Sequence, residues 1–180
     1  MIQGDKVRIR KISLSDADLL CKWWGNGEVM KHVGFTNGVK TDIEGLKDNI
    51  KNQLNDMNKY RKSRMFIVLD KNTEERIGEL VFHDLDLENK SCTIGIKICE
   101  VDYQGKGYGE DTLRTFLTYL FKEFNLHRIE LDTLFENTRA RNLYKKVGFK
   151  EIGIRRDAWI DAEKNYRSFV LMDILEKEMK

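Results

Sequence analysis

The pattern of hydrophobic and polar positions is clearest between residues 110 and 124. Apolar side chains recur there every three or four residues, which is the spacing of an amphipathic helix with one buried face. These positions are Leu113, Phe116, Leu117, Leu120, Phe121 and Phe124. Cap-forming residues predict three more helices: one after Ser13 and Ser15 that ends near Gly25, one opened by Thr41, and one over residues 138–147 between Asn137 and Gly148.

Segments with alternating or β-branched apolar residues predict strands between these helices. Residues 65–69, 76–83 and 93–98 are separated by short polar turns, a spacing typical of an antiparallel meander. Four more strands are expected at residues 7–10, 128–134, 151–159 and 166–175. The pattern therefore predicts an α/β (α+β) fold in one domain over residues 1–180, with a mixed sheet of about seven strands and about four helices.

The composition is that of a folded chain and narrows the classes of partner. Of the 180 residues, 41% are hydrophobic and 34% charged, and the net charge is +2. Nucleic-acid-binding domains usually carry a concentrated basic surface, so nucleic acid is not expected as a partner. No run reaches the roughly 18 apolar residues of a membrane span, and the first residues lack an apolar leader segment. We therefore expect no membrane partner and a cytoplasmic location.

The residue types that usually bind metals are scattered along the chain. Cys21, Cys92 and Cys99 form no Cys-x-x-Cys pair, and the histidines at positions 32, 83 and 127 show no ligand spacing. An odd number of cysteines also argues against a disulfide framework. We therefore expect no metal.

The stretch from residue 101 to residue 110 carries the strongest chemical signal. Gly105, Gly107 and Gly109 lie between the predicted strand 93–98 and the helix that begins near Glu110. A glycine turn before a helix presents backbone N–H groups at the positive end of the helix dipole, which favours phosphate. A P-loop is excluded because no Lys-Ser/Thr pair follows the glycines, and a dinucleotide fingerprint would need a glycine where Glu110 stands.

Two motifs resemble the GNAT acetyltransferase family. Gln104-x-x-Gly107-x-Gly109 is similar to the family's Arg/Gln-x-x-Gly-x-Gly/Ala signature, and residues 137–149 resemble its second cofactor segment, Asn-x-x-Ala-x-x-x-Tyr-x-x-x-Gly-Phe. The resemblance covers essentially the whole chain. It is strongest to the branch of the ribosomal-protein N-terminal and spermidine acetyltransferases. It implies a GNAT-like domain with two splayed parallel strands, here residues 93–98 and 128–134.

The resemblance implies that acetyl-CoA is the co-substrate. The pantetheine arm is expected on the backbone of the first splayed strand, and the pyrophosphate on the glycine turn. Asn137 and Asn142 are expected on the cofactor side, although Asn137 is equally suited to cap its helix. The expected cofactor residues are Lys97, Ile98, Cys99, Gln104, Gly105, Lys106, Gly107, Tyr108, Gly109, Asn137 and Asn142.

The resemblance also assigns catalytic roles. Tyr144 occupies the position of the general acid that protonates the departing thiolate, a task suited to a phenol with a pKa of about 10. Glu100 is the expected base, and Glu79 and His83 stay open as alternatives, as does a chain of water molecules. Direct transfer in a ternary complex is the family norm, so Cys99 is not expected to act as a nucleophile.

The acceptor is the least defined part of the prediction. Candidate walls are Trp23, Trp24, Met30, Phe35 and Trp159, and candidate charges are Asp157, Asp161 and Glu163. The expected acceptor is a small-molecule amine, such as a polyamine, or a protein N-terminus. The alternatives are a non-catalytic module that binds acyl-CoA as a sensor or scaffold, and a nucleotide-binding regulator without preference for CoA. Pairing of edge strands also leaves a homodimer open.

Overall fold

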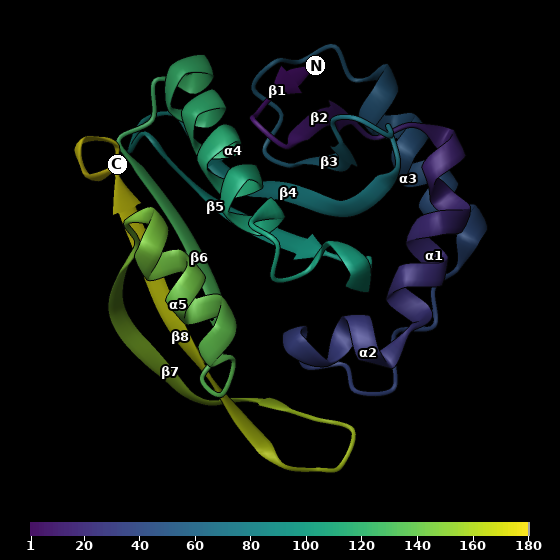
Figure 1. Cartoon of the computed structure of the whole chain (residues 1–180), viewed down its shortest axis with the longest axis vertical. Helices are drawn as coiled ribbons and strands as arrows, with labels where there is room; N and C mark the ends of the chain where they lie inside the picture. The colour runs from purple at the N-terminus through teal and green to yellow at the C-terminus, as the bar shows by residue number, and fades with distance from the viewer. Residues whose placement is uncertain (180) are drawn as a thin grey trace.

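Eight strands form one mixed sheet in the computed structural model, which describes residues 1–179 (Figure 1). Their order is β1-β2-β3-β4-β5-β6-β8-β7, and the α/β class is as predicted. The expected count of seven is one too low. The strand that was missed, β1, pairs with β2 through two residues, which is too short to leave an alternation pattern. The strands are β1 Ile2–Gln3, β2 Val7–Lys11, β3 Arg64–Asp70, β4 Arg76–Asp86, β5 Ser91–Ile98, β6 Arg128–Leu134, β7 Lys150–Ile160 and β8 Tyr166–Leu175.

The predicted meander is confirmed by the antiparallel pairing of β3 with β4 and of β4 with β5. Gly78 lets β4 and β5 approach closely, since a Cβ there would lie 2.2 Å from the carbonyl oxygen of Lys97. The meander brings Glu79 on β4 opposite Lys97 on β5.

Five α-helices are present within residues 1–179, one more than predicted. They are α1 Ala17–Gly25, α2 Gly27–Met30, α3 Ile43–Asn55, α4 Tyr108–Phe124 and α5 Thr138–Val147. The additional helix, α2, is a single turn and lies where a loop was expected. Asp42 rather than Thr41 caps α3, because its side chain accepts a hydrogen bond from the N–H of Glu44. Asn137 caps α5 as predicted, accepting from the N–H of Ala140, and Gly148 ends it with φ at +126°.

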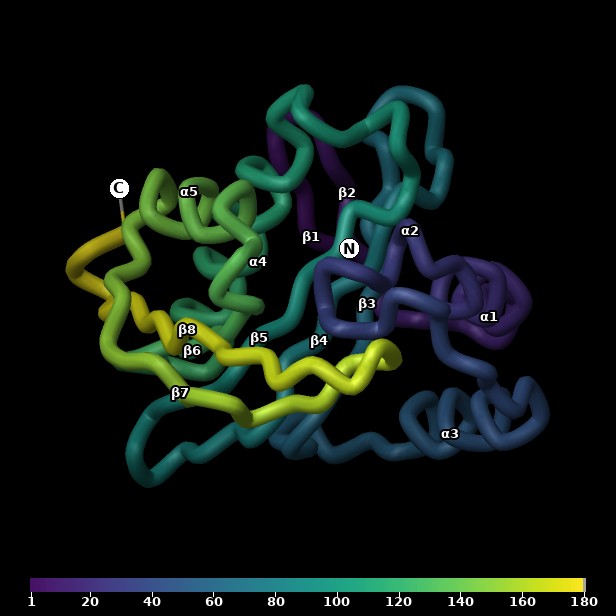
Figure 2. The backbone as a smooth tube through the Cα atoms, turned by 90° about the horizontal axis from the view of Figure 1, so that it is seen from below, coloured from purple at the N-terminus to yellow at the C-terminus, as the bar shows by residue number. Residues whose placement is uncertain are grey.

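The helices form layers on both faces of the sheet (Figures 1 and 2). Helices α4 and α5 pack with the larger core, where Leu113, Phe116 and Leu117 are fully buried. Helices α1 and α3 pack with a second cluster on the opposite face, around Leu20 and Ile50. No helix in the described part of the chain is long and apolar enough to cross a membrane.

The two parallel strands in the middle of the sheet separate after a short paired region. Strand β5 pairs with β6 only from Ser91 opposite Arg128 to Thr93 opposite Glu130, although β5 continues to Ile98 and β6 to Leu134. The predicted splay is therefore present.

The β7–β8 hairpin reaches across to the segment that follows α2, residues 31–42. Trp159 Nε1 donates to the carbonyl oxygen of Gly34 at 3.3 Å, and Thr36 Oγ1 donates to Glu163 at 3.0 Å. Figure 2 shows the tip of the hairpin beside this segment. The contacts join residues more than 120 positions apart and form one wall of the region described next.

Candidate active site

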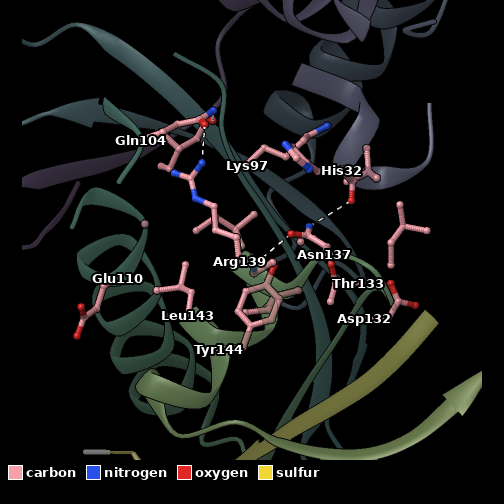
Figure 3. A pocket seen from close by; sticks show the side chains of 18 of the residues that line it. His32, Lys97, Gln104, Glu110, Asp132, Thr133, Asn137, Arg139, Leu143 and Tyr144 are labelled. Atoms are coloured by element: carbon pink, nitrogen blue, oxygen red, sulfur yellow. Dashed lines mark hydrogen bonds between the residues drawn. The ribbon is translucent and has the colours of Figure 1, made fainter. Parts of the chain in front are cut away.

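A cavity of about 540 Å³ lies where β5 and β6 diverge. Strands β5 and β6, the glycine turn, α5 and the segment after α2 all contribute to its lining (Figure 3). The turn and α5 form one end of the cavity, and Val29, His32 and Val33 contribute to the other.

The splay leaves backbone groups of β5 without a strand partner. The N–H of Cys99 donates to the carbonyl oxygen of Ile77 at 2.8 Å, so Cys99 faces β4. Because residues of an antiparallel ladder alternate, Ile96 and Ile98 direct their backbone groups to the other side, into the gap. Gln104 Nε2 donates a hydrogen bond to the carbonyl oxygen of Ile98 at 2.8 Å. The strand segment predicted to bind the pantetheine arm, residues 97–99, therefore lies at the gap. Within it only Ile98 directs its backbone groups into the gap, together with Ile96 just before it.

The glycine turn has the backbone shape that a phosphate cradle needs. Gly105 and Gly107 have φ values of +74° and +87°, and Gly107 is the N-cap of α4. The first N–H groups of α4 have no partner within the helix, and Gly109 belongs to this first turn. Gly105, Gly107 and Gly109 line the cavity together with Gln104.

The other two residues predicted in the turn face elsewhere. The hydroxyl of Tyr108 donates to Asp70 Oδ2 at 2.5 Å, and this hydrogen bond raises the pKa of Tyr108 to about 12. The carbonyl oxygen of Lys106 accepts from Lys6 Nζ at 2.8 Å. Neither residue is part of the cavity lining.

Tyr144 on α5 lines the cavity and is 7% exposed. Its ring packs against Phe149, with ring centroids 5.9 Å apart. Within residues 1–179 its hydroxyl has no hydrogen-bond partner. Burial, and secondarily the charge of Asp132, raises the pKa of Tyr144 to about 12, so the hydroxyl holds its proton at neutral pH. A buried, protonated hydroxyl at the cavity wall is suited to donate a proton to a bound group.

The two asparagines of α5 lie in different surroundings. Asn137 lines the cavity, and its Nδ2 donates to Thr133 Oγ1 at 3.2 Å and to the carbonyl oxygen of His32 at 3.4 Å (Figure 3). Asn137 therefore links α5 to β6 and to the segment after α2 while it caps its helix. Asn142 is exposed and is not part of the lining.

The three candidate bases have different partners. Glu79 is 7% exposed and is held by Trp24 Nε1 at 2.9 Å and by Lys97 Nζ at 2.5 Å. Glu100 Oε1 accepts from Trp23 Nε1 at 2.7 Å, and Glu100 lies outside the cavity lining. His83 lines the cavity, with its Nδ1 at 2.7 Å from Asp84. Cys99 is 2% exposed, and burial raises the pKa of its thiol, which keeps it a neutral core group.

The predicted acceptor walls divide into two groups. Trp23 and Trp24 anchor the carboxylates of Glu100 and Glu79, whereas Phe35 and Trp159 pack edge to face at 5.0 Å. Met30 Sδ lies 3.4 Å from Lys97 Nζ.

A second hollow of about 240 Å³ adjoins the main cavity and shares His32, Leu134 and Asn137 with it. Asp161 lines it but is 5% exposed and pairs with Arg167 at 2.7 Å. Of the other two predicted charges, Glu163 accepts from Thr36, and the backbone N–H of Asp157 donates to Ser168.

Sequence reasoning missed several residues that line the cavity, and two of them make contacts across the fold. Arg139 was not among the predicted cofactor residues, but its Nη1 donates to Gln104 Oε1 at 3.0 Å and joins α5 to the glycine turn. Its position two residues after the Asn137 cap, at the start of a cofactor segment, is the signal that could have identified it. His32 gave no signal, because the tertiary fold alone brings the segment after α2 to the cavity.

Comparison with known proteins gives a consistent family assignment. The family model described as "Acetyltransferase (GNAT) domain" matches residues 6–150. The uncharacterized N-acetyltransferase p20 of Bacillus licheniformis is 32% identical over 153 residues, which covers 85% of this chain and 84% of that protein. The spermidine N(1)-acetyltransferase of Vibrio cholerae is 33% identical over 90 residues, half of this chain and 51% of that protein.

A solved structure shows the same fold. The spermidine N-acetyltransferase from Vibrio cholerae, in complex with CoA and spermine, superposes with a TM-score of 0.84. The match covers 97% of this chain and 98% of that chain, at 23% sequence identity.

Proposed function

The chain belongs to the GNAT acetyltransferase family, and from this we propose that it moves the acetyl group of acetyl-CoA directly to a primary amine in a ternary complex. Acetyl-CoA-dependent N-acetyl transfer is the activity of the family; the proposal concerns the route and the residues. The observation that carries it is Tyr144, a residue only 7% exposed at the cavity wall, whose hydroxyl has no hydrogen-bond partner in residues 1–179.

The backbone is suited to hold the donor. A pantetheine amide needs one hydrogen-bond donor and one acceptor, as a neighbouring strand would. The N–H of Ile98 and the carbonyl oxygen of Ile96 can supply them, whereas the carbonyl oxygen of Ile98 already accepts from Gln104. The glycine turn offers N–H groups at the start of α4 to a diphosphate. Gln104 bridges the two regions through Ile98 and Arg139, and so fixes the turn relative to the strand. In this proposal Asn137 orients the pantetheine arm through its side-chain amide.

The donor supplies an activated thioester carbonyl, and the chain's own groups manage the protons. The amine nitrogen attacks the carbonyl carbon, the new C–N bond forms, and the C–S bond breaks. Tyr144 then gives its proton to the sulfur, the nitrogen loses a proton as the amide forms, and a water molecule relays that proton to the phenolate. The raised pKa of Tyr144 supports this role, because a phenol that stays neutral at working pH has a proton to give.

The proposed base is Glu100, acting through water, with His83 as the rival. Glu100 uses Oε1 for Trp23, and within residues 1–179 its Oε2 accepts no hydrogen bond. His83 has the advantage of lining the cavity, and its contact with Asp84 orients the ring. The base is needed because an ammonium ion has no lone pair with which to attack.

The charges near the acceptor end favour an amine of low positive charge. Three carboxylates near this end already have cationic partners, since Glu79 pairs with Lys97, Asp132 with Arg155, and Asp161 with Arg167. Glu163, by contrast, accepts a hydrogen bond from the neutral hydroxyl of Thr36. A polyamine would have to compete with these pairs. A monoamine or the N-terminus of a peptide needs only one neutral nitrogen at the thioester and an apolar neighbour for Val29 and Val33.

A thiol-release assay tests the proposal. Acetyl-CoA is incubated with monoamines, peptides with free N-termini, and spermidine, and CoA release is followed. We expect turnover with at least one amine, lower kcat/KM for spermidine than for the best monoamine or peptide, and intersecting lines when both substrates are varied. Acetyl-CoA binding without turnover on any acceptor would favour the sensor module. Protection against thermal unfolding by ATP but not by acetyl-CoA would favour the nucleotide regulator.

A further inference from the structure

The turn between β1 and β2 is fixed on the first turn of α4. Asp111 accepts three backbone hydrogen bonds from it: Oδ1 from Asp5 at 3.1 Å, and Oδ2 from Lys6 at 2.8 Å and Val7 at 3.0 Å. Gly4 makes this contact sterically feasible, because a Cβ there would lie 2.6 Å from Asp111 Oδ2 and 2.4 Å from Thr115 Oγ1. The backbone of Lys6 therefore has a defined position relative to the glycine turn, which lies just before α4.

The side chain of Lys6 extends to the outer rim of that turn. Its Nζ donates to the carbonyl oxygen of Lys106 at 2.8 Å and lies 5.6 Å from the ring centroid of Tyr108. It also lies 3.3 Å from the position that a Cβ on Gly107 would take. A positive charge is thus held beside the N-terminus of α4 by residues about 100 positions away in the sequence.

This charge has no compensating carboxylate side chain. Asp111 is occupied by three N–H groups, and Lys6 forms no ion pair among the described residues. Lys146, another lysine near the cavity, is instead paired with Glu110 at 2.5 Å. An ammonium group has three N–H donors, and Lys6 uses one of them on Lys106. The remaining two donors can serve an anion at the rim.

We infer that Lys6 binds a phosphate group of CoA. This places a residue that binds phosphate outside both sequence motifs. Lys6 lies beside Gly107, whereas Arg139 lies beside Gly105. The inference rests on the proposed function, since it takes CoA as the ligand of the turn. The backbone N–H groups hold the phosphate by dipoles, and Lys6 adds the full charge that a multiply charged anion favours. CoA offers two sources, its diphosphate and its 3′-phosphate, which the experiment distinguishes.

The test measures binding rather than turnover. Dissociation constants of CoA and of dephospho-CoA, which lacks the 3′-phosphate, are determined by calorimetry for the wild type, Lys6→Gln, Lys6→Arg and the control Lys11→Gln. Lys11 is exposed on β2, about 17 Å along the strand from Lys6, so it controls for net charge. We expect Lys6→Gln to weaken CoA binding about 3- to 10-fold at about 50 mM salt. Lys6→Arg should retain most of the affinity, and Lys11→Gln all of it.

The dependence on ligand and salt identifies the cause. A loss seen with CoA but not with dephospho-CoA assigns Lys6 to the 3′-phosphate, and an equal loss with both assigns it to the diphosphate. In either case the gap between wild type and Lys6→Gln should narrow by about 500 mM salt, because screening weakens a charge contact at the surface. Unchanged affinity in Lys6→Gln, or a loss that salt does not alter and Lys6→Arg does not restore, would overturn the inference. If the wild type bound no CoA, the proposed function itself would fail.

Discussion

The half of the cavity that we propose for the donor (the donor half) and the half that we propose for the acceptor (the acceptor half) are built in different ways. The donor half depends on the backbone: the unpaired groups of β5, the positive φ of Gly105 and Gly107, and the start of α4. The acceptor half depends on side chains that meet across the fold, such as Phe35 with Trp159 and Trp24 with Glu79. A backbone site holds one ligand and tolerates little change, whereas a wall of side chains can be altered one residue at a time. The fold can therefore keep one donor while its acceptor differs between relatives.

The largest expected effect comes from Tyr144→Phe, at the donor half. Loss of the hydroxyl removes the proposed proton donor, and we expect kcat to fall about 100-fold. The Kd for acetyl-CoA should stay within about 2-fold, because the ring and its packing on Phe149 are retained. Steady-state kinetics and calorimetry check both values. An unchanged kcat would remove the acid role.

The variants Glu100→Gln and His83→Gln identify the base. We expect Glu100→Gln to lower kcat/KM about 10- to 100-fold, since glutamine cannot accept the proton. His83→Gln should change kcat/KM by less than about 3-fold. The reverse result would transfer the role to His83, and unaltered kinetics in both variants would leave water as the proton acceptor.

Outside the cavity lining, at the start of α1, Asp16 tests stability rather than chemistry. Burial alone would raise the pKa of Asp16, but hydrogen bonds from Arg10 and Ser13 outweigh it and lower the pKa to about 2. The group thus stabilises the fold above the ordinary value of 3.8, and this contribution is lost as the pH falls toward 2. We expect Asp16→Asn to reduce the free energy of unfolding by about 2 kcal/mol at neutral pH.

Urea unfolding at several pH values measures this contribution. The gap between wild type and Asp16→Asn should begin to narrow below about pH 4 and be largely closed by about pH 2. Asp18→Asn, an exposed charge on the same helix, is the matched control and should change little. A gap that is constant with pH would show that packing, rather than ionisation, explains the role of Asp16.

The smallest expected effect is that of Trp159→Ala, at the acceptor wall. The change removes the contact with Phe35 and the hydrogen bond to Gly34, so the segment after α2 keeps only the hydrogen bond from Thr36 to Glu163 among the contacts described above with the β7–β8 hairpin. We expect the KM for the acceptor to rise about 3- to 10-fold, with the Kd for CoA unchanged. Trp159→Phe keeps an aromatic ring against Phe35 but loses the indole N–H, so the loss of acceptor binding free energy should be about half of that in Trp159→Ala. A weaker CoA affinity instead would show that the two halves are not separable.

The features that sequence reasoning predicted were those encoded locally. The cap Asn137, the stop Gly148 and the glycine turn each depend on residues within a few positions. The meander and the splay followed from strand spacing and family resemblance. The first strand was missed because two residues are too few to show an alternating pattern. The cap of α3 was assigned to Thr41 instead of Asp42 because both residue types are good caps, and the sequence alone does not distinguish them.

The features that sequence reasoning missed depend on long-range contacts. Trp159 reaches Gly34 over 125 positions, and Lys6 reaches Lys106 over 100. No local pattern marks either pair, because each residue is ordinary in its own segment. His32 entered the cavity lining for the same reason, whereas Arg139 carried a local signal in its position two residues after the Asn137 cap. Prediction from the sequence was therefore best for the donor half and weakest for the acceptor half.

The most direct test of the account is a titration of the labelled protein with CoA, followed by backbone amide NMR. The account predicts that the amide signals of Ile96, Ile98, Gly105, Gly107 and Gly109 shift together and saturate at one equivalent, while those of β7 stay in place. Saturable binding that leaves Ile96 and Ile98 unmoved would contradict the claim that the gap between β5 and β6 holds the donor.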